Sequence, residues 1–344
     1  MKKNILSFIP IALFVIISSI SCNKERHVIG VIIPHDSLVI NVGTTKTLPV
    51  VVFPPDATNK TVTWSSSNTA IATVDNGNVT AIAKGDAVIT VTTNDGGYQA
   101  TCAVKVIDIP EIEMVFVEGG TFIMGCTDEF CYSDELPAHQ VTLSPYFISK
   151  YLVTQELWEA VMEYNPSFHQ NPDSKKHPVE QVSWYDVQTF LSILNQITGR
   201  YYTLPTEAQW EFAARGGNES KGYVYSGSNN PEEVAWYALN SNNTTHPVGT
   251  KAPNELGIYD MSGNVDEWCY DMYAFYTEEP KVDPIVLTSY YYNYHRVIRG
   301  GNFYDEAEYP LRPIRRGLKY EGERKNTIGF RLVEIPMVYE ELDK

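Results

Sequence analysis

The most informative part of the chain reads Asn254-Glu-Leu-Gly-Ile-Tyr-Asp-Met-Ser-Gly-Asn-Val-Asp-Glu-Trp268. Its glycine and asparagine residues predict tight turns, and two carboxylates, Asp260 and Glu267, stand beside large apolar side chains. A loop that buries carboxylates needs compensation for their lost hydration, and a hard cation held by oxygen atoms supplies it. Asp260 and Glu267, with the carbonyl oxygens of Gly263 and Val265, are therefore candidates to bind one calcium ion. An ordinary hairpin with solvated acids is the alternative.

The first 21 residues have the pattern of a secretory signal, in which lysines precede an apolar run from Ile5 to Ile17 and small residues follow it. This run is too short to span a bilayer comfortably. Cys22 comes next, which resembles a bacterial lipoprotein signal whose cysteine is acylated, although Ser19 replaces the usual leucine. We expect cleavage after residue 21, a linker over residues 22–27 and a membrane-anchored lipoprotein of a bacterial cell envelope, at the outer membrane or cell surface. A soluble secreted protein is the alternative.

The net charge of the chain limits the classes of molecule that it can bind. The full sequence has a net charge of −16, and loss of the signal removes two lysines and leaves −18. Such a surface repels nucleic acid, so we expect no nucleic acid partner. The seven histidines include no pair at i, i+4 spacing, and no nucleophile elbow, phosphate loop or zinc motif is present.

Four cysteines remain after Cys22: Cys102, Cys126, Cys131 and Cys269. An export compartment permits disulfides. Cys126 and Cys131 flank a short acidic loop, so they are candidates to pair. Their spacing alone is a poor metal signature.

Residues 28–107 hold short runs rich in valine, isoleucine and threonine, separated by turn clusters. This spacing predicts a β-sandwich in which Trp64 is a core anchor. The segment resembles bacterial immunoglobulin-like domains through Val42-Gly43-Thr44, Val62-Thr63-Trp64-Ser65-Ser66-Ser67-Asn68, Ile71-Ala72-Thr73-Val74 and Gly85-Asp86-Ala87-Val88-Ile89-Thr90-Val91. The resemblance implies a spacer that lifts the next domain off the membrane, with adhesion as the alternative.

The remainder of the chain predicts an α+β domain with much irregular loop. Met114 to Gly125 has two apolar runs around a Gly-Gly pair, which predicts a hairpin. Helical spacing and capping residues predict three helices, over Thr154–Met162 with Thr154 as the cap, Ser183–Ile197 with Ser183 as the cap, and Leu204–Gly217 with Thr206 and Gln209 in a capping box. From residue 222 onward, turns and aromatic residues dominate.

These segments together resemble the formylglycine-generating enzyme family, also called sulfatase-modifying factors, whose domain is a C-type-lectin-like variant. The matching pieces occur in the family's order: Gly119-Gly120-Thr121-Phe122-Ile123-Met124-Gly125, Pro178-Val179-Glu180-Gln181-Val182-Ser183-Trp184, Leu204-Pro205-Thr206-Glu207-Ala208-Gln209-Trp210-Glu211, Gly257-Ile258-Tyr259-Asp260-Met261-Ser262-Gly263-Asn264-Val265, Arg299-Gly300-Gly301 and Gly329-Phe330-Arg331. The resemblance implies this fold over residues 108–335, with a C-terminal tail over residues 336–344.

The resemblance also implies which metals to expect. The family's calcium site falls on Asp260, Gly263, Val265 and Glu267, so a structural calcium ion is expected there. In the active enzymes, two cysteines after Arg-Gly-Gly bind copper(I) and convert a substrate cysteine into formylglycine.

In this chain the two copper-binding positions are Asp305 and Pro310, and no cysteine lies after Cys269. Asn302 occupies the position of the family's active-site serine, and Asp266 occupies the position of a tryptophan in the family's Trp-Glu-Trp segment. A soft metal selects thiolates, so copper is not expected.

The segment that forms the ligand face in the family supplies the candidate ligand-binding residues. It is rich in tyrosine, a residue that offers rigid area and a hydroxyl, although packing of a loop-rich fold explains any single tyrosine equally well. Arg312, Arg315, Arg316 and Arg324 predict a basic patch suited to a carboxylate, a sulfate or an acidic partner. The candidates are Asn302, Phe303, Tyr304, Asp305, Arg312 and Arg315.

The sequence therefore favours a lipid-anchored protein of two domains. An immunoglobulin-like spacer presents a formylglycine-generating-enzyme-like domain that lacks its copper cysteines and binds an unknown protein or glycan ligand, or serves as an accessory subunit. Two rivals stay open. One is an oxidoreductase that matures sulfatases, and the other is a calcium-dependent, lectin-like glycan receptor.

Overall fold

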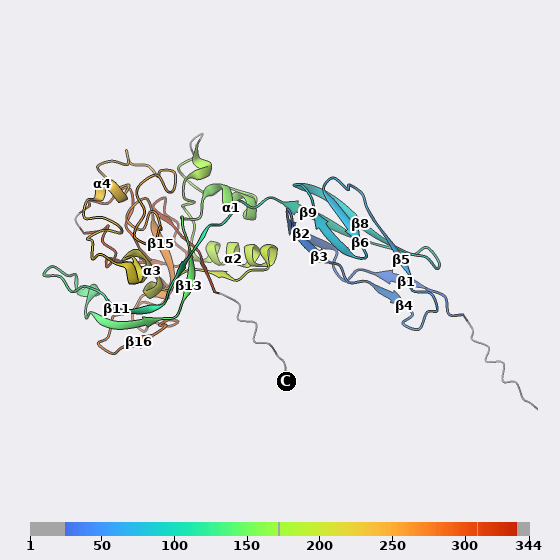
Figure 1. Cartoon of the computed structure of the whole chain (residues 1–344), viewed down its shortest axis with the longest axis horizontal. Coiled ribbons are helices and arrows are strands. Elements are labelled where there is room, and N and C mark those ends of the chain that lie inside the picture. Colours follow the sequence, from blue (N-terminus) through green and yellow to red (C-terminus); the bar gives the residue numbers. More distant parts are fainter. Residues whose placement is uncertain (1–24, 171–172, 308, 336–344) are drawn as a thin grey trace, which may run out of the picture.

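The computed structural model describes residues 25–170, 173–307 and 309–335. Strands β1 to β9 form one body and the remaining elements form the other (Figure 1). The predicted signal, Cys22 and the C-terminal tail lie outside the described residues. In the described part of the chain, no helix is long and apolar enough to cross a membrane.

The N-terminal body is a β-sandwich, as the sequence predicts. One sheet has the order β2-β9-β8-β5, a second has the order β3-β7-β6, and β1 pairs with β4. Fully buried aliphatic side chains from both sheets, such as Ile40, Val79 and Ile89, meet between them, and the partly buried Trp64 packs against this core. The strands are β1 (Gly30–Ile32), β2 (Ser37–Asn41), β3 (Thr45–Thr47), β4 (Val51–Phe53), β5 (Val62–Ser66), β6 (Ala72–Asp75), β7 (Asn78–Ala81), β8 (Gly85–Thr93) and β9 (Gln99–Ile107).

The C-terminal body contains three small sheets, with the orders β10-β13-β20-β14, β11-β12-β16 and β18-β17-β15-β19. Its strands are β10 (Met114–Val117), β11 (Gly120–Met124), β12 (His139–Leu143), β13 (Tyr146–Ser149), β14 (Tyr202–Thr203), β15 (Asp266–Met272), β16 (Lys281–Val282), β17 (His295–Arg299), β18 (Arg316–Tyr320), β19 (Ile328–Gly329) and β20 (Val333–Glu334). Irregular loops connect most of them, which agrees with the predicted class.

The hairpin predicted at Met114–Gly125 is wrong. β10 and β11 are the two apolar runs, but β10 pairs with β13 and β11 pairs with β12, so the two runs lie in different sheets. At Gly119 a β-carbon would lie 2.2 Å from the carbonyl oxygen of Leu143. The Gly-Gly pair therefore permits a close crossing between two sheets instead of a hairpin turn.

The predicted helices and their caps are confirmed. The side chain of Thr154 accepts a hydrogen bond from the backbone of Leu157 at the start of α1, and Ser183 and Thr206 form capping boxes at the starts of α2 and α3. The helices are α1 (Gln155–Met162), α2 (Trp184–Thr198), α3 (Glu207–Ala214) and α4 (Pro231–Val234), with short 3-10 helices at Ser133–Glu135, Ser174–Lys176 and Gly217–Glu219.

Two further features bear on the site. Cys126 and Cys131 form a disulfide, so the loop between them is closed at its base. Cys102 and Cys269 are free and buried. The sheet β18-β17-β15-β19 lies next to α3, with which both β15 and β17 are in contact.

Candidate functional site

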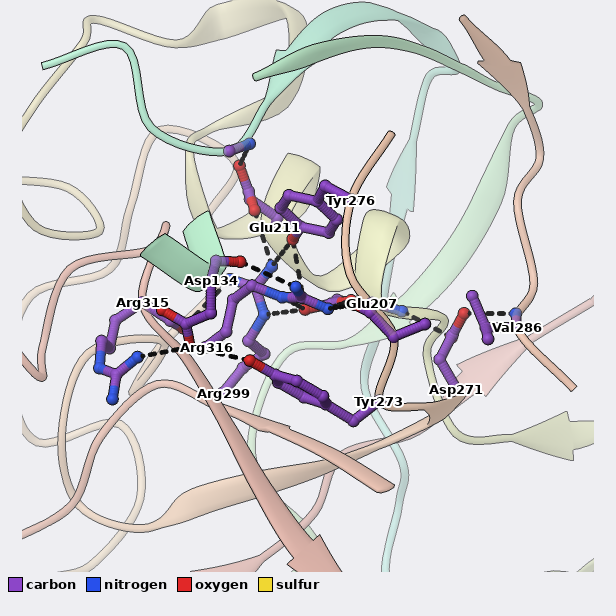
Figure 2. Close-up of polar contacts among 12 residues, drawn as sticks. Asp134, Glu207, Glu211, Asp271, Tyr273, Tyr276, Val286, Arg299, Arg315 and Arg316 are labelled. Atoms are coloured by element: carbon purple, nitrogen blue, oxygen red, sulfur yellow. Dashed lines mark hydrogen bonds and ion pairs between the residues drawn. The ribbon is translucent and has the colours of Figure 1, made fainter. Parts of the chain in front are cut away.

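A buried network of arginines and glutamates connects helix α3 to strands β17 and β18 (Figure 2). Arg299 at the end of β17 donates to Glu207 at 2.9 Å and to Glu211 at 2.7 Å. Arg316 at the start of β18 donates to both oxygens of Glu207, at 2.6 and 2.8 Å. All four residues are less than 5% exposed. Helix α3 supplies both carboxylates because residues four apart lie on one helix face.

Charge compensation keeps these carboxylates ionised inside the domain. Burial alone raises the pKa of Glu207, but Arg316 and Arg299 outweigh it and hold that pKa below its ordinary value. The remaining arginine hydrogen atoms reach backbone oxygens, including those of Pro313 and Asp134. The network thus ties α3 and two strands to the loops that surround the site.

A second buried ion pair joins the loop at residues 254–268 to Arg331. Arg331 donates to both oxygens of Glu267, at 2.6 and 2.9 Å, and to the carbonyl oxygen of Tyr259 at 2.9 Å. Glu267 and Arg331 are both fully buried. The guanidinium group of Arg331 therefore supplies positive charge next to Glu267, where the sequence predicts a calcium ion.

The predicted calcium ligands fit an ion only in part. Asp260 is buried and accepts hydrogen bonds from the backbone of Gly249 and the side chain of Asn264. Glu267 does not fit as a ligand, because both of its oxygens are held by Arg331. Among the described residues, no group of three or more His, Cys, Asp or Glu side chains could hold a metal ion. A calcium ion on Asp260 and the backbone of Gly263 and Val265 stays a prediction.

A cavity of about 590 Å³ opens beside β17 and β18. Two carboxylates, Asp266 and Asp305, meet there at one amide group. The side-chain nitrogen of Asn302 lies 2.9 Å from an oxygen of Asp266 and 2.8 Å from an oxygen of Asp305. The backbone N–H of Asn302 also donates to Asp305, at 3.0 Å. The three side chains form one hydrogen-bonded unit.

Burial acts on both carboxylates of this unit. It raises the pKa of Asp266 to about 7, and the neighbouring charge of Asp305 adds to the effect. Burial also raises the pKa of Asp305, against the opposing influence of hydrogen bonding and of Arg315 and Lys319. A carboxyl group with the pKa of Asp266 can hold or release a proton near neutral pH.

The structure brings most of the predicted ligand-binding residues together and separates two of them. Asn302, Tyr304, Asp305 and Arg315 line the cavity, and so does Pro310. Phe303 is fully buried and does not line it. Arg312 lies beside a smaller cavity of about 240 Å³ and is held by Glu135 at 3.1 Å.

The predicted basic patch is also corrected. Arg316 belongs to the buried network, Arg312 and Arg315 pair with Glu135 and Asp134, and Arg324 pairs with Asp186 at 2.7 Å. All four arginines form ion pairs with carboxylates of the same domain, so they do not form one basic surface that is free to bind a ligand. Tyr290 and Tyr291, at 88% and 75% exposed, lie outside the cavity.

Sequence reasoning missed several residues of the cavity wall, two of which are charged and stand next to the aspartates or to Arg315. Lys319 and Asp134 both line the cavity, and neither stands in a motif that could mark it. Asp134 comes from a segment about 180 residues earlier than its partner Arg315. Asp266 was noticed only as a departure from the family pattern, and that departure was the available signal.

Comparison with known proteins places this geometry in a family. Residues 104–335 match the Sulfatase-modifying factor enzyme 1-like domain, a stretch that is more than half of the chain. The chain belongs to this family. Residues 27–104 match the Bacterial Ig-like domain (group 2), which agrees with the observed sandwich.

Three similar proteins illustrate the breadth of the family. The Chaperone protein LppX of Paenibacillus barcinonensis is 38% identical over 212 residues, which cover 47% of this chain and 72% of that protein. The Formylglycine-generating enzyme of Thermomonospora curvata is 28% identical over 263 residues, which cover 57% of this chain and 84% of the enzyme. Among solved structures, Treponema denticola variable protein 1 aligns with a TM-score of 0.59 and 30% identity, over 71% of this chain and 98% of that one.

Replacement of Glu207 by glutamine should destabilise the C-terminal domain. The change leaves Arg299 and Arg316 buried without their shared carboxylate, and breaking a buried pair costs roughly 3–5 kcal/mol. Guanidinium unfolding followed by tryptophan fluorescence measures the effect, since five of the six tryptophans lie beyond residue 108. Glu323→Gln is the control, because its pair with Lys325 is partly exposed and worth less than about 1 kcal/mol. Equal losses in both variants would contradict the role of the network.

Replacement of Asp266 by asparagine should change how stability depends on pH. The pKa of Asp266 is raised in the folded protein, so the folded state keeps a proton that the unfolded state has lost between about pH 4 and pH 7. Stability from this group therefore falls as pH rises through that window. Melting temperatures at pH 5 and pH 8 should show Asp266→Asn gaining on the native protein at the higher pH. The exposed Asp128→Asn variant should run parallel to the native protein.

Proposed function

We propose that the C-terminal domain serves in ligand or protein binding, or as an accessory subunit, and does not oxidise cysteine. The observation that carries this proposal is the composition of the cavity. The positions where the resemblance places copper-binding cysteines are Asp305 and Pro310, and both line the cavity. No residue of the chain after Cys269 is a cysteine, and Cys269 itself is fully buried.

The chemistry of the cavity suits recognition. Copper(I) is a soft ion that selects thiolates, and carboxylate or amide oxygens do not replace them. The unit formed by Asp266, Asn302 and Asp305 instead offers hydrogen-bond acceptors to a ligand. Arg315 and Lys319 add donors to the same wall. Such convergent polar groups in a cavity are the usual basis of ligand recognition.

A relative supports an accessory role. One similar protein is named a chaperone, and it is more alike in sequence to this chain than is the formylglycine-generating enzyme of Thermomonospora curvata, with 38% against 28% identity. Binding another polypeptide is what the word chaperone describes. The proposal extends that role to this chain.

We also propose where the protein is located and how its C-terminal domain is presented. An acylated Cys22 would anchor the protein in a bacterial envelope membrane, and the immunoglobulin-like domain would act as a spacer. The β-sandwich has a core of its own, and a short connection follows it, where the backbone of Ile109 donates to Asn41 at 2.9 Å. These features favour a presented domain over a freely tumbling one.

A direct assay separates this proposal from the sulfatase-maturing alternative. Mature protein is incubated under air with copper and a sulfatase-type peptide, Cys-x-Pro-x-Arg, and formylglycine is sought by mass spectrometry. We expect no conversion, because the cavity presents no thiolate to copper. A formylglycine-generating enzyme with an intact cysteine pair is the positive control. Conversion at a comparable rate would overturn the binding proposal.

The anchor is tested separately by metabolic labelling with a fatty acid analogue in a bacterial host. The native protein should carry label and Cys22→Ser should not, because acylation needs the thiol of that residue. Cys102→Ser is the matched control and should keep its label. Label retained in Cys22→Ser would show that the cysteine is not the anchor.

A further inference from the structure

The carboxylate pair in the cavity lacks a cation of its own. Among the described residues, neither Asp266 nor Asp305 forms an ion pair within 4.0 Å, and the group that joins them is the neutral amide of Asn302. Elsewhere at this end of the domain, the buried carboxylates of Glu135, Glu207 and Glu211 each contact an arginine. Asp271 is also buried without an ion pair in the described part of the chain, but backbone N–H groups of Glu207 and Val286 donate to its two oxygens, at 2.9 and 2.8 Å. The contact that joins Asp266 and Asp305 is a single neutral amide.

The neighbouring cations do not supply the missing charge by contact. Arg299 and Arg316 also line the cavity, and both are engaged by Glu207. Arg315 is engaged by Asp134 at 3.1 Å, and Lys325 by Glu323 at 3.3 Å. Lys319 lines the cavity and influences both aspartates from a distance, but forms no ion pair with either of them in the described part of the chain. Two carboxylates half removed from water and joined only by an amide are costly unless a positive group joins them.

We propose that Asp266 and Asp305 bind the ammonium group of a ligand, such as that of a lysine side chain or of a free alkyl diamine. The proposal rests on the binding role proposed above and names the chemical class that the cavity recognises. An ammonium group has three hydrogen atoms and no acceptor, so it can bond to both carboxylates at once. Charge-assisted bonds of this kind are about twice as strong as neutral ones.

The rest of the cavity suits the chain that carries the ammonium. Its volume of about 590 Å³ leaves room for several methylene groups beyond the charged end. Tyr304 lines the same cavity and is half exposed, so it offers aromatic surface to an alkyl chain. Asn302 is only 8% exposed and holds both aspartates in place, which makes it a positioning residue.

The test is calorimetric titration of the mature protein with three probes at pH 8. The probes are Nα-acetyl-lysine methylamide, cadaverine and Nα-acetyl-norleucine methylamide, which keeps the alkyl chain but lacks the ammonium group. We expect binding of at least one of the two amines and none of the norleucine compound. The lysine compound and the diamine distinguish a polypeptide source from a free amine. Equal binding of norleucine, or no binding of either amine, would overturn the proposal.

Variants make the test specific to the pair. Asp305→Asn should weaken amine binding at least tenfold at pH 8, while the adjacent and exposed Glu306→Gln should leave it unchanged. Lys319→Met should strengthen binding, because it removes a like charge from the cavity wall. A purely structural defect would not strengthen binding, and melting curves identify variants that fail to fold. Unchanged affinity in a folded Asp305→Asn would refute the proposal.

The outcome is independent of the formylglycine assay. A protein that forms no formylglycine and binds no amine would leave the binding role in place but remove the ammonium ligand. A protein that binds amines and also forms formylglycine would keep the ligand but remove the exclusively non-catalytic role.

Discussion

Compensation of buried charge is the constraint on which the C-terminal domain depends. Helix α3 faces the interior with two carboxylates, and their free energy inside the domain is acceptable only because Arg299 and Arg316 meet them. Each arginine also binds backbone oxygens of loops that lack regular partners. In a domain with small sheets and long connections, such pairs hold the loops that a larger hydrophobic core would otherwise hold.

The sequence was sufficient where the determinants are local. Capping residues and helical spacing located α1, α2 and α3, because a cap is a contact within three or four residues. The sequence did not predict contacts between residues that lie far apart in the chain. The runs of β10 and β11 looked like a hairpin, but their partners β13 and β12 could be chosen only in three dimensions. The same reason explains the false basic patch, since Arg312 finds Glu135 across 177 positions.

For the site, the resemblance located the cavity and its loss of thiols, and the structure supplied the geometry. Asn302 and Asp305 were both predicted as ligand-binding residues, but the convergence of Asp266 on the amide of Asn302 needs the folded sheet. The calcium site stays a prediction, and the structure adds that the side chain of Arg331, 64 positions away, contacts Glu267. Residue types alone do not identify such a remote partner.

The buried ion pairs and the cavity share part of one wall, because Arg299, Arg316 and the pair of Arg315 and Asp134 also line the cavity. The loop positions Asn302, Tyr304 and Asp305 contribute to the cavity, and none of them belongs to an ion pair in the described part of the chain. Replacing any of these three residues therefore removes none of the buried ion pairs. The residues of this loop can therefore differ between proteins of one fold while the ion pairs that hold the fold persist.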